Sequence, residues 1–349
     1  MVPNLYDIES YAYDLPEGRI AQTPASPRNH SRLLVLDKNS GTMIHSRFYE
    51  LHRFLKEGDV IVLNDTRVIP ARLFGVKEKG SARAEILLLK PLDGLWKRWE
   101  ALVRPGRRLR PGSIVIVRED IPVQVQEALA DGVRVVRFPE ECNVLSLLEE
   151  VGEIPFPPYI KSTTATALDY QTVFAKRNGS SAAPTASLHF TENQLRDLED
   201  KHGITFAWVT LHVGLGTFRP VQEEDIRQHV IHEEYCEVPE ETAALIRKAK
   251  EEGRRIIASG TTVARTLESM ATHDENVVQY GRKNTSLFIY PGYQFSVIDG
   301  LITNFHLPRS TLLMLVAALA GYDNIMEVYE TAVKMGYRFF SFGDAMLIQ

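Results

Sequence analysis

The sequence predicts a mixed α/β protein: an α/β main domain that carries an inserted small antiparallel β-barrel domain. Strand and helix patterns alternate over the second half of the chain, which is typical of a largely parallel sheet. Short β-branched segments fill residues 58–138 without a helix-length amphipathic stretch, which favours a small barrel or sandwich. The length of 349 residues suggests two domains, at roughly 100–200 residues per domain.

The elements justify this fold in chain order. SRLLVLDKNSGTMIHSRF joins an apolar run to a second short run through Asn-Ser-Gly, which predicts a β-hairpin. GDVIVLN, VIPARLFGVK, ARAEILLLKPL, RWEALVRPG, GSIVIV, PVQVQEAL and GVRVVRF then read as strands separated by Gly, Pro and Asp. A helical pattern returns at 144–151, and the Pro-rich GEIPFPPYIK predicts a rigid connector.

Beyond the connector, ITFAWVTLHV, RRIIASG, SLFIY, GLITNF and FFSFG are strand candidates. The helix candidates are 192–202, 240–252, 263–270, 311–320 and 325–335. We therefore expect a discontinuous α/β catalytic domain at 1–57 plus 151–349 and an inserted β-barrel domain at 58–150. A plain N-terminal β domain followed by an α/β domain is the alternative.

Composition is that of an ordinary globular protein, with 44% hydrophobic and 24% charged residues. The longest apolar run, 312–320, is far shorter than the ~20 residues that a membrane span needs. The N-terminus has acidic residues and lacks the apolar stretch of a signal peptide. Cys142 and Cys236 lie far apart, outside any metal-binding or redox spacing. We expect a cytoplasmic monomer with no membrane partner and no metal.

The net charge of −5 hides an asymmetry. Residues 61–138 hold 15 Lys and Arg against 9 Asp and Glu, a balance of +6, so the remainder carries −11. Arg104, Arg107, Arg108 and Arg110 crowd the stretch VRPGRRLRPG. A polyanion such as a nucleic acid is one partner that this excess predicts, and a solvated basic loop is the alternative.

Two small-residue segments are candidate ligand-binding loops. GSSAAPTASLH, from Gly179 to His189, offers close backbone approach and hydroxyls, including that of Thr185, but it lacks the ending of a phosphate-binding P-loop. HVGLGTF, from His212, follows an apolar strand, and Gly214 and Gly216 permit a tight turn next to Thr217. It lacks the third glycine and the helix of a dinucleotide fingerprint. Structural loops are the alternatives.

Two further strand ends carry polar groups. SGTT opens a helix, where the amides near Gly260, Thr261 and Thr262 could bind an anion, unless one of the threonines simply caps the helix. NFHLPRS sets Asn304 and His306 against an apolar helix, and buried polar groups of this kind are either satisfied or functional.

Three other polar groups have two interpretations each. Asp344, in FSFGDAML, either pairs with Arg338 or performs acid–base work. NDTRVIPAR, which contains Arg67 and Arg72, is either an Asx turn or the start of the basic surface. The histidines of QHVIHEEYCEV are three apart, but the flanking residues favour strand or loop over a helical metal site.

The strings YDLPEGRIAQTP, GDVIVLNDTRVIPARLFG, PFPPYI, AAPTASLHFTE, VTLHVGLGTFRPV, HVIHEE, GTTVARTLES, IYPGYQF, LITNFHLPRSTLLMLVAALAG and YRFFSFGDAML occur in this order. Together they resemble the S-adenosylmethionine:tRNA ribosyltransferase-isomerase family of queuosine biosynthesis, nearly end to end. The resemblance implies an α/β domain with an inserted barrel. It also implies transfer and isomerisation of the ribosyl group of S-adenosylmethionine, as substrate, onto 7-aminomethyl-7-deazaguanine at the tRNA wobble position.

The implied chemistry gives epoxyqueuosine-tRNA and releases adenine and methionine. It needs a base that reaches C5′ and an acid that assists the departure of adenine. The candidates for these catalytic roles are His189, His212, His306 and Asp344. Candidates for holding S-adenosylmethionine are Thr185, Gly214, Gly216, Thr217, Gly260, Thr261, Thr262 and Asn304. Candidates for tRNA contact are Arg67, Arg72, Arg104, Arg107, Arg108 and Arg110.

One departure from the family pattern concerns the small-residue loop, where Ser187 stands in place of a glycine. If that position requires a positive φ, serine costs about 1 kcal/mol or more. Two rival functions remain at this point. A methyltransferase would yield S-adenosylhomocysteine, and a non-catalytic module would bind tRNA without consuming S-adenosylmethionine.

Overall fold

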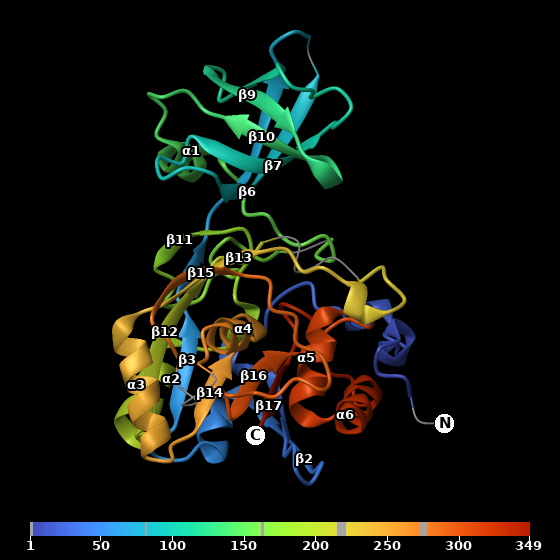
Figure 1. Ribbon diagram of the computed structural model, residues 1–349, viewed down its shortest axis with the longest axis vertical. Coiled ribbons are helices and arrows are strands. Elements are labelled where there is room, and N and C mark those ends of the chain that lie inside the picture. The colour runs from blue at the N-terminus through green and yellow to red at the C-terminus, as the bar shows by residue number, and fades with distance from the viewer. Residues whose placement is uncertain (1–2, 81, 162–163, 215–220, 273–277) are drawn as a thin grey trace. The chain divides into compact units, whose positions relative to one another are not determined.

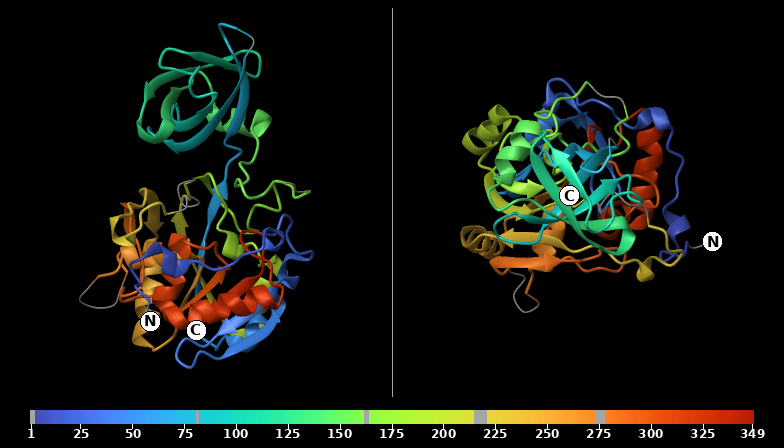
Figure 2. Two further views of the ribbon diagram at one scale, coloured as in Figure 1. Left: turned by 90° about the vertical axis from the view of Figure 1, so that its right-hand side faces the viewer. Right: turned by 90° about the horizontal axis from the view of Figure 1, so that it is seen from above.

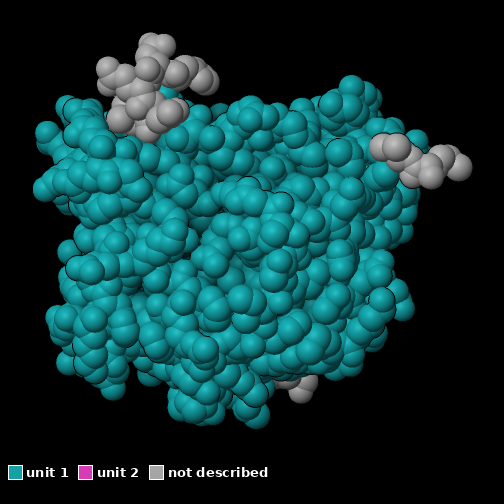
Figure 3. All heavy atoms as spheres, turned by 90° about the horizontal axis from the view of Figure 1, so that it is seen from below, with its two compact units in different colours: residues 1–66, 158–177, 183–349 teal, residues 67–157, 178–182 magenta. Residues whose placement is uncertain are grey.

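The computed structural model describes residues 3–80, 82–161, 164–214, 221–272 and 278–349. The chain forms two compact units. Unit 1 comprises residues 1–66, 158–177 and 183–349, and unit 2 comprises residues 67–157 and 178–182. Figure 3 shows one face of unit 1. Each unit is described by itself below.

A nine-stranded mixed sheet forms the centre of unit 1 (Figure 1). In spatial order its strands are β15 (Gly281–Thr285), β13 (Glu234–Val238), β12 (Thr205–Leu211), β3 (Val60–Asn64), β14 (Ile256–Ser259), β16 (Gly300–Asn304), β17 (Ala345–Ile348), β1 (Arg32–Leu36) and β2 (Met43–Arg47). The neighbours β12, β3, β14 and β16 run parallel to one another. Their carboxyl ends therefore meet at one edge of the sheet.

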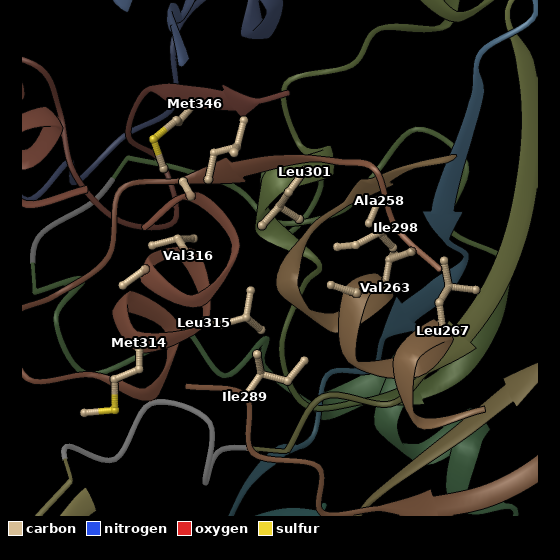
Figure 4. Close-up of a cluster of buried hydrophobic side chains, with 14 of the residues drawn as sticks. Ala258, Val263, Leu267, Ile289, Ile298, Leu301, Met314, Leu315, Val316 and Met346 are labelled. Atoms are coloured by element: carbon tan, nitrogen blue, oxygen red, sulfur yellow. The ribbon is translucent and has the colours of Figure 1, made fainter. Parts of the chain in front are cut away.

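Helices cover both faces of this sheet (Figure 2). They are α2 (Glu192–His202), α3 (Glu240–Glu251), α4 (Thr261–Ser269), α5 (Thr311–Ala320) and α6 (Tyr322–Lys334). Under α4 and α5, Val263 and Leu315 join a core with Ala258 and Leu301 of the sheet (Figure 4). On the other face, α2 packs with the 3₁₀ helix η4 (Phe48–Phe54) over the alternate residues of the same strands. The fold is thus a three-layer arrangement.

Six antiparallel strands close into a barrel in unit 2. In order around the barrel they are β10 (Val133–Arg137), β7 (Arg98–Arg104), β6 (Arg83–Pro91), β5 (Arg72–Lys77), β8 (Ile114–Val117) and β9 (Ile121–Ala128). Trp99 and Val115 are fully buried inside it. A Cβ on Gly75 would lie 2.5 Å from the carbonyl oxygen of Ile116, so the approach of β5 to β8 requires glycine there.

The remaining elements are short. They are α1 (Val144–Val151), the paired strands β4 (Thr66–Val68) and β11 (Arg177–Ser180), and the 3₁₀ helices η1 (Ile8–Tyr11), η2 (Glu17–Arg19), η3 (Arg28–His30), η5 (Ala130–Gly132), η6 (Thr185–Ser187) and η8 (Ile226–Gln228). Within the described ranges, no single helix is long and apolar enough to cross a membrane, although α5 and α6, bent by 118°, satisfy the length and composition criteria as a pair.

The α/β class with a small antiparallel barrel is confirmed, and so is the early hairpin, which is β1 paired with β2. Two strand predictions were wrong, and one correctly predicted strand was assigned to the wrong sheet. GDVIVLN contains β3, which lies in the middle of the large sheet and not in the barrel; its five consecutive buried residues are typical of a central parallel strand. SLFIY and FFSFG are not strands, and the neighbouring β15 and β17 lie in the sheet instead.

Candidate active site

Polar residues end three of the four parallel strands, His212 directly follows the fourth, and the side chain of Asn64 joins the ends of β3 and β12. Its Oδ1 accepts the backbone N–H of Leu211 (3.1 Å), and its Nδ2 donates to the Leu211 carbonyl (3.0 Å). Nδ2 also lies 3.5 Å from the Thr262 hydroxyl at the start of α4. Ligands of open α/β sheets bind outside the carboxyl ends of the strands. This edge is therefore the place to look for a site.

A pocket opens at this edge, entirely within unit 1. It is lined by Ala183, Pro184, Thr185, Ala186, Val213, Gly260, Thr261, Thr262, Thr303, Asn304, Phe305, His306, Leu312, Phe340 and Ser341. The small residues leave room, the threonines and Asn304 offer hydrogen bonds, and the two phenylalanines offer apolar surface. No carboxylate, ammonium or guanidinium group occurs among these lining residues. An anionic ligand group would therefore depend on neutral hydrogen-bond donors.

The N-terminus of α4 supplies such donors. Gly260 is the N-cap at φ +103°, a conformation that strains any L side chain. Within the described part of the chain, no side chain makes the capping hydrogen bond, so Thr261 and Thr262 do not play the structural role that was the alternative. Gly260, Thr261 and Thr262 line the pocket, so the free amides and the positive dipole end at the start of α4 lie beside it.

Asn304 lies at the centre of a buried hydrogen-bond chain. Thr185 Oγ1 donates to Asn304 Oδ1 (3.2 Å), and Asn304 Nδ2 donates to His189 Nε2 (3.0 Å). His189 therefore carries its proton on Nδ1 and donates it to Ser31 Oγ (2.8 Å). Burial lowers the pKa of His189 to about 3, so the ring is neutral. His189 does not line the pocket; it orients the amide that does.

Replacing Asn304 with alanine is expected to lower kcat/KM for the substrate that enters this pocket about 10- to 100-fold, because Thr185 and His189 each lose a buried partner. Steady-state kinetics of the purified variant measure this effect. Ser46→Ala is a matched control, since it also removes a side-chain hydrogen bond, to Glu50, but outside the pocket. An Asn304 variant with the kinetics of the control would contradict the assignment.

Both ring nitrogens of His306 are also engaged. Thr303 Oγ1 lies 3.2 Å from Nε2, and the Tyr329 hydroxyl lies 3.2 Å from Nδ1. The same hydroxyl accepts the backbone N–H of His306 (2.9 Å), so its own proton is directed to Nδ1. Burial lowers the pKa of His306 to about 3. This histidine lines the pocket as a neutral, fixed group.

The lowered histidine pKa values predict acid sensitivity of the fold. His189 and His306 stay neutral in the folded state down to about pH 3, whereas in the unfolded chain they gain protons below 6.5. Stability is then present above pH 6.5 and is lost as the pH falls, at up to about 1.4 kcal/mol per pH unit for each ring. Urea unfolding between pH 7 and 5 should show a shallower pH dependence for His306→Gln than for wild type. Equal slopes would contradict the buried neutral state.

His212 differs from the other two histidines. It follows β12 directly and precedes Val213 of the pocket lining. Its Nδ1 lies 2.8 Å from Thr66 Oγ1, and its ring stacks on Tyr235, with 5.4 Å between the ring centroids. Within the described residues Nε2 has no hydrogen-bond partner. Burial, followed by the charge of Arg177, lowers the pKa of His212 to about 4, so its ring is neutral at pH 7.

Asp344 is committed to structure. Its carboxylate accepts the backbone N–H groups of Arg32 (2.9 Å) and Arg338 (2.8 Å) and lies 3.5 Å from the Arg338 guanidinium. It is buried and does not line the pocket. This geometry favours the ion-pair interpretation over an acid–base role. The sequence motif alone could not separate the two.

A buried ion pair supports the loop after β12. Arg265 of α4 bonds to Glu234, and the two side chains are only 5% and 4% exposed. The other oxygen of Glu234 accepts the backbone N–H of Gly214 (3.0 Å). Gly214 follows Val213, which lines the pocket, and the Glu234–Arg265 pair fixes the Gly214 backbone through this hydrogen bond. Gly216 and Thr217, the other candidates in this loop, lie outside the described residues.

Ser187 does not need a positive φ. It ends the 3₁₀ helix η6 and is absent from the described non-glycine residues with positive φ, so the strain considered from the sequence does not arise. Its hydroxyl is 2.8 Å from that of Ser259, at the end of β14. The serine thus joins the small-residue loop to a strand end.

Phe340 and Ser341 were missed as pocket residues by the reasoning from sequence. Phe340 has φ +72°, which is strained for an aromatic residue and typical of functional turns. Tyr159 packs edge-on against Phe340, with ring centroids 4.0 Å apart, and its hydroxyl is 2.5 Å from Ser341 Oγ. The Pro-rich connector therefore contributes to this wall. Both residues belong to the segment FFSFG, whose apolar pattern predicts a strand and not a pocket wall.

The candidate tRNA-binding arginines are exposed, except for half-buried Arg72. Arg104, Arg107, Arg108 and Arg110 follow one another at the end of β7 and in the turn beyond it, and Arg67 lies in β4.

His229 pairs with Glu223 (2.8 Å), and no group of three or more potential metal ligands occurs among the described His, Cys, Asp and Glu residues.

The fold is a sheet between two layers of helices, with a pocket beyond its parallel strands and an uncapped helix N-terminus beside that pocket. This combination is that of an α/β enzyme that binds a small polar ligand. Residues 8–348 match the family described as queuosine biosynthesis protein, and the chain belongs to this family. It is 49% identical over 343 residues to an S-adenosylmethionine:tRNA ribosyltransferase-isomerase of Natranaerobius thermophilus, covering 98% of this chain and 99% of the relative. It is 52% identical over 345 residues to the protein of that name from Heliobacterium modesticaldum, with the same coverage.

A solved structure gives the same result. The crystal structure of an S-adenosylmethionine tRNA ribosyltransferase from Thermotoga maritima is 40% identical in sequence, with a TM-score of 0.56. The match covers 97% of this chain and 100% of that one. The family resemblance stated from the sequence motifs is therefore confirmed.

Proposed function

We propose that this chain transfers and isomerises the ribosyl group of S-adenosylmethionine onto 7-aminomethyl-7-deazaguanine at the wobble position of tRNA. The products are epoxyqueuosine-tRNA, adenine and methionine. The observation that carries the proposal is the coincidence of the pocket with the family strings: APTA, GTT and TNFH, which the family match spans, line one cavity beyond the parallel strands. The names of the relatives support S-adenosylmethionine and tRNA as the substrates.

The pocket residues suggest how S-adenosylmethionine is held. Because no basic side chain occurs among the described residues that line the cavity, the methionine carboxylate would bind to the amides at the start of α4 and the hydroxyls of Thr261 and Thr262. The apolar walls, Phe305 and Phe340, suit the adenine base. The orientation of Asn304, fixed through His189, would place an amide against the ribose.

For the chemistry, we assign His212 as the base that removes a proton from C5′, which the adjacent sulfonium makes acidic. Among the described residues, Nε2 of His212 has no hydrogen-bond partner, whereas both ring nitrogens of His189 and of His306 are hydrogen-bonded. The ribose then opens as adenine leaves, the base amine of the tRNA joins C1′, and the epoxide forms as methionine departs. His306, which follows β16 and lines the pocket as a neutral group, is assigned a positioning role.

A product assay tests the proposal. The protein is incubated with S-adenosylmethionine and tRNA bearing the aminomethyl base, and the expected result is equimolar adenine and methionine, with a tRNA mass increase of one ribosyl-derived unit. S-adenosylhomocysteine with a methyl-sized increase would instead identify a methyltransferase. Tight tRNA binding without turnover would identify a binding module.

A further inference from the structure

The outer wall of the barrel exposes an aromatic ring among arginines. Along β5, Leu73 points into the barrel and is fully buried, while Phe74 and Val76 point outward and are 49% and 44% exposed. Phe74 lies opposite Glu85 of β6, and Glu85 lies opposite Arg104 of β7. Directly opposed residues of antiparallel strands share a face of the sheet. These three side chains therefore form one outward row.

A second outward row lies beside the first. Val76 is opposite Arg83 of β6 on one side and opposite half-buried Ile116 of β8 on the other. We call these six residues the Phe74 face: Phe74, Val76, Arg83, Glu85, Arg104 and Ile116. All belong to unit 2. The face thus has an apolar stripe with a guanidinium group at an end of each row.

The charge of this surface favours an anion. Glu85 is the one carboxylate in the two described rows, and it lies between Arg72 Nε (3.3 Å) and Arg104 Nη1 (3.9 Å). Arg104 remains 83% exposed, and Arg83 is exposed as well. Two arginines therefore share one carboxylate, and Arg83 adds a third positive charge to this surface. A partner with regularly spaced negative charges would complement this surface.

We propose that the Phe74 face binds a single-stranded segment of the substrate tRNA, with an unpaired base stacked on Phe74 and flanking phosphates on Arg83 and Arg104. An exposed aromatic ring next to arginines is the combination that binds single-stranded nucleic acid, because every base has a flat face and every nucleotide a phosphate. A duplex keeps its bases stacked on each other, so it could not use the ring. The inference rests on the proposed function, of which it specifies the RNA-binding surface.

Fluorescence anisotropy with end-labelled tRNA tests this surface. Phe74→Ala is expected to weaken binding about tenfold with an unchanged salt dependence, and Phe74→Trp should bind like wild type. Arg104→Ala is expected to weaken binding and to reduce the slope of log K against log salt by about 0.7 to 1. Leu129→Ala is the matched control, because Leu129 is an apolar residue of the same unit with 41% exposure. Circular dichroism checks that each variant is folded.

Each outcome decides a different point. If wild type binds tRNA and releases adenine while Phe74→Ala behaves like Leu129→Ala, the Phe74 face is not the RNA surface, although the proposed function stands. If wild type does not bind tRNA, the proposed function fails with it. If both Phe74→Ala and Phe74→Trp lose tRNA binding, a flat aromatic face is not sufficient at this position, and the stacking proposal is overturned.

Discussion

Replacing His212 with alanine is expected to lower the rate of adenine release about 10²- to 10⁴-fold, the range that a general base contributes. Among the three candidate histidines, it alone has a ring nitrogen without a partner in the described structure. His212→Gln can still hydrogen-bond to Thr66 but cannot accept a proton, so it should be equally slow. Single-turnover release of adenine, followed by chromatography, measures the effect.

His202→Ala is a matched control for this prediction. His202 lies in α2 and stacks on His52, outside the pocket lining, so its loss should leave turnover unchanged. A His212→Ala enzyme within about threefold of wild type, with an unchanged thermal midpoint, would show that the base is another group.

Replacing Glu234 with alanine is expected to destabilise unit 1 by about 3–5 kcal/mol, because it leaves the buried guanidinium of Arg265 without its carboxylate. For a domain of this size, the melting temperature should fall by about 6–20 °C. The same change removes the acceptor for the Gly214 amide, so the loop beside the pocket loses its anchor. Thermal unfolding followed by circular dichroism measures the first effect, and turnover measures the second.

Two further variants separate these effects. Glu237→Ala, on the same strand, breaks ion pairs to the more exposed Arg177 and Arg282 and should cost only about 1 kcal/mol. The double variant Glu234→Leu with Arg265→Met should recover most of the stability, since an apolar pair replaces a buried ion pair, but not the turnover. Equal melting temperatures of Glu234→Ala and Glu237→Ala would contradict the large stabilisation that we expect from the Glu234–Arg265 pair.

The sequence was informative where local chemistry determines structure. The sequence motifs indicate six pocket residues, and the structure brings all of them together: Thr185, Gly260, Thr261, Thr262, Asn304 and His306. Each sits at a strand end or a helix start, and parallel strands place such ends at a common edge. Small residues next to hydroxyl groups could therefore be recognised from their order alone.

What the sequence could not provide depends on long-range partners. The difference between His189, His212 and His306 is a difference in hydrogen-bond partners from Ser31, Thr66 and Tyr329, which lie far away in the chain. The strand β3 was placed in the barrel because its β-branched residues look alike in both sheets, and only its neighbours distinguish them.

The sequence did not predict Phe340 as a pocket residue for a similar reason. Its role depends on a strained backbone and on packing against Tyr159 from the connector, neither of which leaves a local pattern. Asp344 shows the converse case, in which a local pattern suggested chemistry, but the carboxylate accepts the backbone N–H of nearby Arg338 and that of Arg32, which is distant in the chain.

The fate of label from S-adenosylmethionine tests the central claim most directly. Two preparations, one carrying ¹⁴C in the ribose and the other in the methyl group, are incubated in parallel with the protein and tRNA bearing the aminomethyl base. The ribose label is expected on the tRNA in proportion to the adenine released, and the methyl label is expected in free methionine. Methyl label on the tRNA, with the ribose label in S-adenosylhomocysteine, would contradict ribosyl transfer at this site.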